Sequence, residues 1–367
     1  MKKVIHIVGA RPNFIKAAPL IKKMNKLCID NLVVHTGQHY DHNMSQQFFN
    51  ELNIPEPDYN LGAGGGSHAT QTANIMIGCE RVFAEHNPDL VIVYGDVNSC
   101  VAATLVATKM HLDGHCKTKV AHVEAGLRSF DRNMPEELNR MVTDSISDLY
   151  FVTCEDAMVN LKNEGVDESK CHFVGNTMID SLVEFNDKFD TSNILPTLNL
   201  SKKDYALVTL HRPSNVDDKH HLIEMMDSMV EVSKLIKCIF PIHPRTRGNL
   251  NKFGLYDKYR SIDSLIITEP LGYVDFMCLQ KNSKLIITDS GGVQEESSFF
   301  DVPCLTLREN TERPITVEEG TNKLIGTNYA DICNYIKNMN YDVKSNIKLW
   351  DGFSSDRIIK VLEKEVI

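Results

Sequence analysis

Short apolar runs alternate with helix-length segments along most of the 367-residue chain, and this alternation constrains the fold more than any other feature. In the first half, the apolar runs are rich in β-branched residues and cover residues 4–8, 32–35, 90–94, 120–123, 149–152 and 172–174. The helix-length segments between them include residues 15–27, 71–85, 99–109 and 136–147. This pattern predicts a parallel β-sheet that is covered by helices on both faces.

The alternation stops at residues 187–203, which are polar and show no periodicity. It restarts with six further apolar runs, at residues 205–210, 238–242, 265–268, 285–288, 304–307 and 323–325. Because the chain is too long for one ordinary core, we expect two α/β domains, each a doubly wound, Rossmann-like sheet. The first covers residues 1–175 and the second covers residues 176–352. An amphipathic C-terminal helix, at about 353–367, is expected to cross back to the first domain.

Composition excludes several classes of protein. The formal net charge is -10 and no long Lys/Arg run occurs, which argues against a nucleic-acid partner. The ten cysteines include no C-x-x-C pair, so we interpret them as free thiols in a reducing compartment. No segment approaches the roughly 20 apolar residues that span a bilayer. We therefore expect a cytoplasmic protein with no zinc knuckle and no membrane partner.

Parallel open sheets bind ligands beyond the carboxyl ends of their strands, so the polar residues after each predicted strand are the candidates for a site. We expect the two sheets to face each other across a cleft that holds this site. After the first strand, Arg11 lies at the turn into a helix that starts with Pro12, and Lys16 follows one turn later. Together they form either an anion-binding corner or a pair of solvated cations. The glycine pattern of a dinucleotide-binding turn is absent here.

Three carboxylates follow the third and fourth strands of the first domain. Asp96 comes directly after a strand and either reaches the site or caps the next helix. Glu124 ends a buried strand beside a glycine, a position with no simple structural explanation. Glu136 and Arg140 are four residues apart on one helix face, so they can pair, either at the site or as a surface ion pair.

The second domain repeats the pattern with different residue types. His211 follows its first strand, as a catalytic or a structural histidine. Ser290, Gly291 and Gly292 follow another strand and open a helix, which exposes backbone N–H groups suited to a diphosphate. Glu296, further along that helix, is placed to bind ribose hydroxyls, and Arg313 adds a cation. The alternative is that the two glycines serve packing only.

These motifs together resemble the non-hydrolysing UDP-N-acetylglucosamine 2-epimerases. The likeness runs in family order over nearly the whole chain and rests on GARP…K (9–16), TGQH (36–39), YGD (94–96), HVEAGLRS (122–129), PEELNR (135–140), GNTMID (175–180), LHRPSN (210–215), TDSGGVQEE (288–296) and TERP (311–314). Each motif is weak alone, but the ordered series is specific.

The resemblance implies a GT-B-like fold, no cofactor (neither a metal nor a nicotinamide), a homodimer and a role in supplying surface polysaccharide. It implies an active-site set consisting of Arg11, Lys16, Asp96, Glu124, Glu136, Arg140 and His211. It also implies UDP contacts from Phe276, Ser290, Gly291, Gly292, Glu296 and Arg313. Many members bind a second UDP-N-acetylglucosamine as an activator, which here would involve the region of Gln38 and His39.

The chain departs from the commoner family form at three places. GARPN stands where GTRPE is common, and HRPSN stands where HRREN is common. The pair Gln38-His39 is kept, but the next two residues, Tyr40 and Asp41, differ from the common form. The GARPxF variant also occurs in relatives that act on modified UDP-sugars, so such a sugar is an alternative substrate. Three other functions stay open: a GT-B glycosyltransferase with an acceptor groove, a hydrolysing epimerase, and a non-catalytic UDP-sugar sensor.

Overall fold

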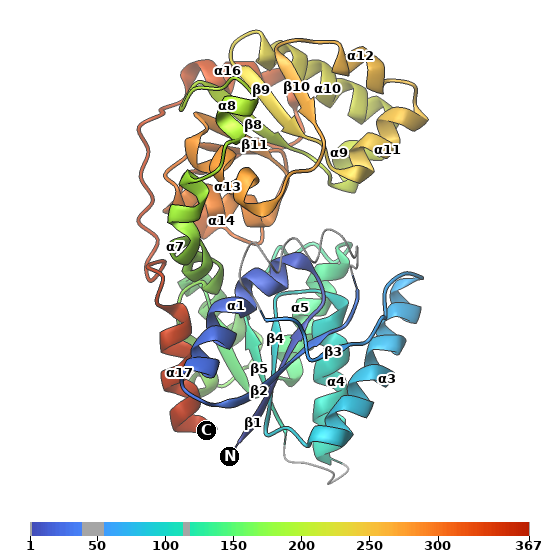
Figure 1. Cartoon of the computed structure of the whole chain (residues 1–367), viewed down its shortest axis with the longest axis vertical. Coiled ribbons are helices and arrows are strands. Elements are labelled where there is room, and N and C mark those ends of the chain that lie inside the picture. Colours follow the sequence, from blue (N-terminus) through green and yellow to red (C-terminus); the bar gives the residue numbers. More distant parts are fainter. Residues whose placement is uncertain (1, 39–54, 113–117, 367) are drawn as a thin grey trace. The chain divides into compact units, whose positions relative to one another are not determined.

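The computed structural model describes residues 2–38, 55–112 and 118–366, and the chain divides into two compact units (Figure 1). Unit 1 contains the chain up to Phe185 and again from Lys348, and unit 2 contains Asn186–Ile347. The division lies inside helix α7 (Thr177–Asp190), whereas the boundary expected from sequence precedes this helix. Part of the polar stretch 187–203 is therefore helical, since α7 ends at Asp190 and α8 (Ile194–Thr197) follows.

Unit 1 is built on a seven-stranded, entirely parallel sheet with the order β3-β2-β1-β4-β5-β6-β7. Its strands are β1 (Lys3–Val8), β2 (Asp30–His35), β3 (Tyr59–Asn60), β4 (Leu90–Tyr94), β5 (Lys119–Val123), β6 (Leu149–Val152) and β7 (Cys171–Phe173). Its other helices are α1 (Arg11–Lys26), α3 (His68–His86), α4 (Asn98–Leu112), α5 (Pro135–Ile146), α6 (Glu155–Asn163) and α17 (Ser354–Glu365). The six expected strands are confirmed to within a few residues.

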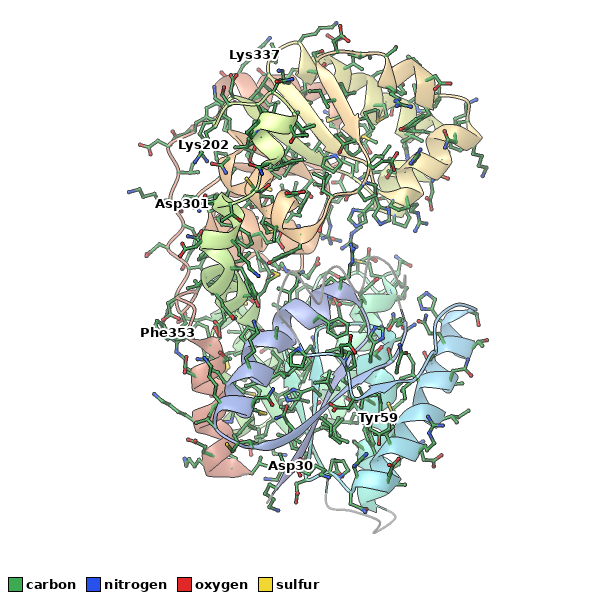
Figure 2. The ribbon with its side chains drawn as sticks, viewed as in Figure 1. Asp30, Tyr59, Lys202, Asp301, Lys337 and Phe353 are labelled. Carbon is green, nitrogen blue, oxygen red and sulfur yellow. The ribbon has the colours of Figure 1, made fainter. Side chains whose placement is uncertain are left out.

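The two-residue edge strand β3 was not expected from the sequence. It is too short to carry a periodic signal, and it pairs with β2 through Val34 and His35. Tyr59, labelled in Figure 2, anchors it, because the Tyr59 hydroxyl lies 2.6 Å from Nε2 of His86 at the end of α3. A contact to a distant helix fixes this strand, so its own sequence does not predict it.

Alternate residues of the central strands face opposite sides of the sheet. Ile5 and Ile7 of β1, together with Val91 and Val93 of β4, pack in one cluster with side chains of α3 and α4. The cluster members on these helices include Ile75, Cys79, Phe83, Ala103 and Val106. Because every residue of β4 is buried, both faces of the sheet are covered, as the continuous apolar runs predict.

Unit 2 contains a six-stranded parallel sheet with the order β10-β9-β8-β11-β12-β13. Its strands are β8 (Tyr205–Thr209), β9 (Lys237–Pro241), β10 (Leu265–Thr268), β11 (Leu285–Thr288), β12 (Cys304–Thr306) and β13 (Asn322–Leu324). Its helices after α8 are α9 (Pro213–Val216), α10 (Lys219–Ser233), α11 (Pro244–Lys252), α12 (Tyr256–Arg260), α13 (Tyr273–Asn282), α14 (Gly291–Phe299), α15 (Ile315–Glu318) and α16 (Ile332–Asn338).

Two separate clusters cover the two faces of this second sheet. Ala206 and Val208 pack with side chains of α10 and α16, whereas Tyr205 and Leu207 pack with α8, α13 and α14. The alternation along β8 thus divides its side chains between two apolar layers. Both units are doubly wound α/β structures, which confirms the expected fold class.

Helix α17 belongs to unit 1 and contacts α1. Asp180 of α7 fixes its beginning, because its carboxylate accepts hydrogen bonds from the backbone N–H groups of Ser354 and Ser355 at 3.0 and 2.7 Å. Phe353, labelled in Figure 2, directly precedes the helix. Within the described ranges, no helix is both long and apolar enough to cross a membrane.

Candidate active site

Each sheet reverses its strand order at one point, and the candidate residues follow the strands on either side of it. In unit 1 this point lies between β1 and β4, and in unit 2 it lies between β8 and β11. Connections on the two sides of such a point run in opposite directions, which leaves room for a ligand beyond the carboxyl ends of the strands. Arg11 and Asp96 flank the first point, and His211 and Ser290 flank the second.

In unit 1, the turn from β1 into α1 is held by Asn13. Its Oδ1 accepts hydrogen bonds from the backbone N–H groups of Ala10 (2.8 Å) and Gly9 (3.2 Å). Its Nδ2 donates to the carbonyl of Tyr94 at the end of β4 (2.7 Å). A glutamate, the commoner family residue here, has no N–H to donate to that carbonyl. Arg11, the first residue of α1, is half-buried.

Lys16 in the second turn of α1 and Glu124 directly after β5 form a buried ion pair. Their side chains are only 8% and 5% exposed. Glu124 adopts a left-handed backbone conformation, with φ of 73°. Such a conformation costs a non-glycine residue about 1–2 kcal/mol and marks functional sites when the surrounding structure enforces it. Here the Phe151 carbonyl accepts from the backbone N–H groups of Glu124 (3.0 Å) and Ala125 (3.2 Å).

Asp96 pairs with Arg140, whose side chain is 2% exposed. Arg140 also binds Glu137 on the same helix, at 2.8 Å from its Nη2. The pair in the structure is thus Glu137–Arg140, three residues apart, in place of the expected Glu136–Arg140 pair. Glu136 lies on the exposed side of α5. Asp96 has an ion-pair partner, which goes beyond the helix-capping role considered from sequence.

Glu137, which sequence reasoning missed, connects α5 to the loop after β5. Its carboxylate accepts from the backbone N–H groups of Ser129 (3.0 Å) and Phe130 (2.8 Å), as well as from the Ser129 hydroxyl. Burial raises the pKa of Glu137, but these N–H groups and Arg140 outweigh it and hold the pKa below its ordinary value. The motif PEELNR contains two adjacent glutamates, and two adjacent positions of a surface helix do not both face inward. This pattern could have indicated that either glutamate was a candidate partner of Arg140.

Gln38 lies beside the beginning of α4. Its Oε1 accepts from the backbone N–H and the hydroxyl of Ser99, at 3.1 and 2.8 Å. Thr36 Oγ1 lies 2.8 Å from the same hydroxyl. His39, the other residue of the expected activator region, is outside the described residues.

In unit 2, His211 is oriented by Asp289. The His211 Nδ1 lies 3.1 Å from an Asp289 oxygen, and the same carboxylate accepts from the backbone N–H of Arg212 and the Asn215 amide. Asp289 is fully buried, and these donors hold its pKa below the ordinary value although burial acts in the opposite direction. A carboxylate at Nδ1 fixes the ring so that Nε2 points away from it. Sequence reasoning missed Asp289, although it directly precedes Ser290.

A second histidine, His243, packs on His211, with ring centroids 4.9 Å apart. Burial, reinforced by His211, lowers the pKa of His243 to about 4. Its Nδ1 accepts from the backbone N–H of Arg245. His243 is therefore a neutral ring at pH 7, and it was not among the residues expected from sequence.

Helix α14 begins with Gly291 directly after Ser290, as expected. A Cβ on Gly291 would lie 2.6 Å from both Arg313 Nη1 and Glu312 Oε1, so this glycine permits a close approach of two charged side chains. A Cβ on Gly292 would meet no heavy atom within 4 Å. Packing thus accounts for Gly291 but not for Gly292, which presents open backbone at a helix N-terminus.

Arg313 lies between two buried carboxylates. Its Nε is 2.9 Å from Glu295 and its Nη1 is 2.5 Å from Glu312. Glu312 also binds Arg308 at 2.7 Å. The expected diphosphate cation is therefore one member of a buried cluster. Burial raises the pKa of Glu312, but Arg313 and Arg308 lower it far below the ordinary value.

Arg308, another cation of this cluster, was not among the residues predicted from sequence. Its Nη1 is buried and has no hydrogen-bond partner among the described residues.

Two of the predicted UDP contacts lie on α13 and α14. Glu296 is buried and accepts from Gln280 Nε2 at 2.5 Å, and Phe276 on α13 is partly buried against the α8/α13/α14 cluster. In the described part of the chain, no group of three or more His, Cys, Asp or Glu side chains is arranged to hold a metal.

Comparison with known proteins places this geometry in a family. A family model described as UDP-N-acetylglucosamine 2-epimerase matches residues 22–363. A UDP-N-acetylglucosamine 2-epimerase homolog of Methanococcus maripaludis is 46% identical over 98% of this chain and 99% of its own length. A UDP-2,3-diacetamido-2,3-dideoxy-D-glucuronate 2-epimerase of Pseudomonas aeruginosa is 40% identical over 88% of both chains.

A solved structure is similar over the same extent. The crystal structure of the Methanocaldococcus jannaschii UDP-GlcNAc 2-epimerase in complex with UDP-GlcNAc and UDP has a TM-score of 0.90 and 44% sequence identity, covering 99% of this chain and 100% of that chain. The sequence comparison and the fold comparison therefore agree. The chain belongs to the UDP-N-acetylglucosamine 2-epimerase family, and it is an isomerase.

Proposed function

We propose that the protein interconverts UDP-GlcNAc and UDP-N-acetylmannosamine without net hydrolysis. The observation that carries this proposal is the pair of strand-end carboxylates in unit 1, Asp96 and Glu124, each bound by a buried cation. Proton transfer at a sugar carbon needs a positioned acid and base, and carboxylates can serve as both. The relative of known structure, whose crystals contain UDP-GlcNAc and UDP, supports the choice of substrate.

The reaction must invert C2, whose hydrogen is not acidic because no carbonyl group is adjacent in the ring. Elimination solves this problem: a base removes the C2 proton, the C1–O bond breaks, and UDP leaves with the bonding electrons. The product of this step is 2-acetamidoglucal. Return of a proton to the opposite face of C2, with re-addition of UDP at C1, gives the epimer and balances the reaction.

The residues divide between these two tasks. Asp96, Glu124 and Glu136 are the candidates for the base and the acid at C2. Arg140 balances the charge of Asp96, and Lys16 balances the charge of Glu124. The departing diphosphate is stabilised by Arg11, Arg313 and the N-terminus of α14, where each well-aimed donor contributes about 10²–10³ in rate. His211 serves near the diphosphate or as a proton donor. Phe276 and Glu296 bind the nucleoside, and Ser290, Gly291 and Gly292 bind the diphosphate.

A second candidate substrate is a modified UDP-sugar. The 40% identity to the enzyme named for a diacetamido-glucuronate sugar favours it, and that relative is matched over 88% of this chain. The same elimination applies, because that name also places an acetamido group at C2.

Three further properties are proposals that follow from the family. A second UDP-GlcNAc binds as an activator near Gln38 and His39, and the chain forms a homodimer. The cytoplasm is the proposed location, supported by the nine described cysteines, all of which are free thiols. Supply of surface polysaccharide is the proposed role.

The test is proton NMR of the purified protein with UDP-GlcNAc in D2O, without added metal or nicotinamide. We expect UDP-N-acetylmannosamine with deuterium at C2. Release of free UDP and N-acetylmannosamine would contradict the non-hydrolysing reaction. Exchange only with the diacetamido-glucuronate sugar would replace the substrate by the second candidate.

A further inference from the structure

A fully buried histidine, His122 of β5, lies between the two strand-end turns of unit 1. Its Nδ1 is 2.6 Å from Asp144 Oδ1 on α5, and its Nε2 is 2.8 Å from the Gly95 carbonyl oxygen. Both His122 and Asp144 are 0% exposed. Neither residue is used by the proposed reaction.

The two partners of this ring determine its protonation. The Gly95 carbonyl can only accept, so Nε2 carries a hydrogen. The other oxygen of Asp144 accepts from the Gly126 N–H at 3.0 Å and lies 2.7 Å from Arg128 Nη2, an arrangement that requires an ionised carboxylate. An ionised carboxylate facing Nδ1 requires a second hydrogen there. The geometry therefore defines His122 as a buried imidazolium.

The charges around the ring balance. Arg128 binds Asp144 on one side and Glu164 on the other, with Nε and Nη2 donating to the two Glu164 oxygens at 2.8 and 2.6 Å. Four alternating charges thus lead from His122 in the core to Glu164, whose side chain is 36% exposed. Burial raises the pKa of Asp144, but His122 and Arg128 lower it below the ordinary value. The ring thus lies beside an opposite charge and has a hydrogen-bond partner at each nitrogen, which are the conditions under which buried charges occur in proteins.

The His122–Asp144 pair holds both turns that carry the candidate carboxylates. Gly95 directly precedes Asp96 and has φ of +72°, and a Cβ on it would lie 3.3 Å from Lys16 Nζ and 3.4 Å from Glu124 Oε2. The carbonyl that His122 binds therefore belongs to a residue in close contact with the Lys16–Glu124 pair. Asp144 in turn binds the N–H of Gly126, two residues after Glu124.

We propose that His122 and Asp144 are positioning residues, in which an imidazolium bound at both ring nitrogens fixes the Gly95–Asp96 turn against the Lys16–Glu124 pair. The inference rests on the proposed function for its catalytic consequence, but not for its structural content. A shift of about 1 Å in a reacting group can cost about 10²-fold in rate, so this anchoring is kinetically important.

The first test is 15N NMR of the full-length protein labelled at histidine, at pH 7.5. We expect both ring nitrogens of His122 to carry hydrogens. His6 of β1 is the internal control, since it is equally buried and burial lowers its pKa to about 3, so its ring is neutral. A His122 ring with a single N–H overturns the inference.

The second test uses two uncharged variants that keep different halves of the ring's hydrogen bonding. His122→Gln keeps a donor near the Nε2 position, toward Gly95, whereas His122→Asn keeps one near the Nδ1 position, toward Asp144. We expect kcat to fall about 100-fold for His122→Asn and about tenfold for His122→Gln, with KM within about threefold of wild type. His6→Asn is the matched core control, and its folded fraction should keep wild-type kcat.

Equal kcat losses in the Gln and Asn variants, or losses that simply follow Tm, would overturn the positioning role. Should the wild-type protein fail to turn over any UDP-sugar, the proposed function falls but the inference is still decided. In that case the backbone amide signals of Gly95, Asp96 and Glu124 must shift more in His122→Asn than in His122→Gln. Unchanged amide signals in His122→Asn would overturn it.

Discussion

The polar centres of the two units occupy the same topological position but contain different charge patterns. In unit 1, carboxylates at strand ends pair with buried cations, as in Lys16–Glu124 and Arg140–Asp96. In unit 2, Arg308 and Arg313 share the carboxylate of Glu312 beside the N-terminus of α14. The first pattern suits proton transfer, and the second suits an anion.

The turns after the strands explain this difference. In unit 1, Gly95, Glu124 and Gly126 all have left-handed backbone conformations, which turn the chain sharply after β4 and β5 and place side chains at the sheet edge. In unit 2, the chain after β11 enters a helix at once, so backbone N–H groups of Gly291 and Gly292 are presented there instead. The same sheet topology thus supports two chemistries, and the local turn selects between them.

The largest effect is expected from Glu124→Gln, which keeps the shape of the side chain and removes its charge. Turnover of UDP-GlcNAc should fall about 10³-fold, because a positioned acid or base contributes about 10²–10⁴ in rate. The Kd for UDP should stay within about threefold, since Glu124 is not among the proposed UDP contacts. Calorimetry and the NMR assay measure the two quantities, with Glu80→Gln on the exposed side of α3 as control. Unchanged turnover would remove Glu124 from the mechanism.

Substitutions at the neighbours Glu136 and Glu137 of unit 1 should affect different properties, turnover in the first case and stability in the second. Glu137→Gln should lower the free energy of unfolding by about 3 kcal/mol, because it removes one partner of a buried ion pair. Glu136→Gln, on the exposed side of α5, should leave stability unchanged and reduce turnover. Urea denaturation and the NMR assay distinguish them; the reverse pattern would contradict both assignments.

The lowered pKa of Glu137 predicts that the effect of Glu137→Gln on the free energy of unfolding depends on pH. Because the pKa of Glu137 is lowered in the folded protein, its contribution is fully present above its ordinary pKa of about 4.3 and is lost as the pH falls toward its folded value. The stability difference between wild type and Glu137→Gln should therefore shrink between pH 6 and pH 3. A constant difference over that range would show that the carboxylate charge plays no part.

The smallest effect is expected at the start of α14. Gly291→Ala should raise the Kd for UDP about tenfold and lower Tm, because Arg313 and Glu312 must move away from the new methyl group. Gly292→Ala should raise the Kd for UDP without lowering Tm, since its methyl group meets open space within the protein. Wild-type UDP affinity in Gly292→Ala would show that the diphosphate binds elsewhere.

Most of the secondary structure and the positions of the candidate residues at the sheet edges could be predicted from sequence, for one reason. Apolar runs mark strands, and the residue after a strand lies at the carboxyl edge wherever the sheet is parallel. This argument selected Asp96, Glu124, His211 and Ser290 without knowledge of their contacts. It could not identify partners, and it therefore paired Arg140 with Glu136 instead of Glu137.

The sequence by itself determined the two doubly wound sheets and the polar residues at their edges, because hydrophobic periodicity is a local property of the chain. Only the tertiary structure decided which charges meet. The pairs His122–Asp144, Lys16–Glu124 and Arg313–Glu295 join residues far apart in sequence or on different elements. Such pairs depend on strand order and on burial to within a few ångströms, and no local pattern in the chain records either quantity.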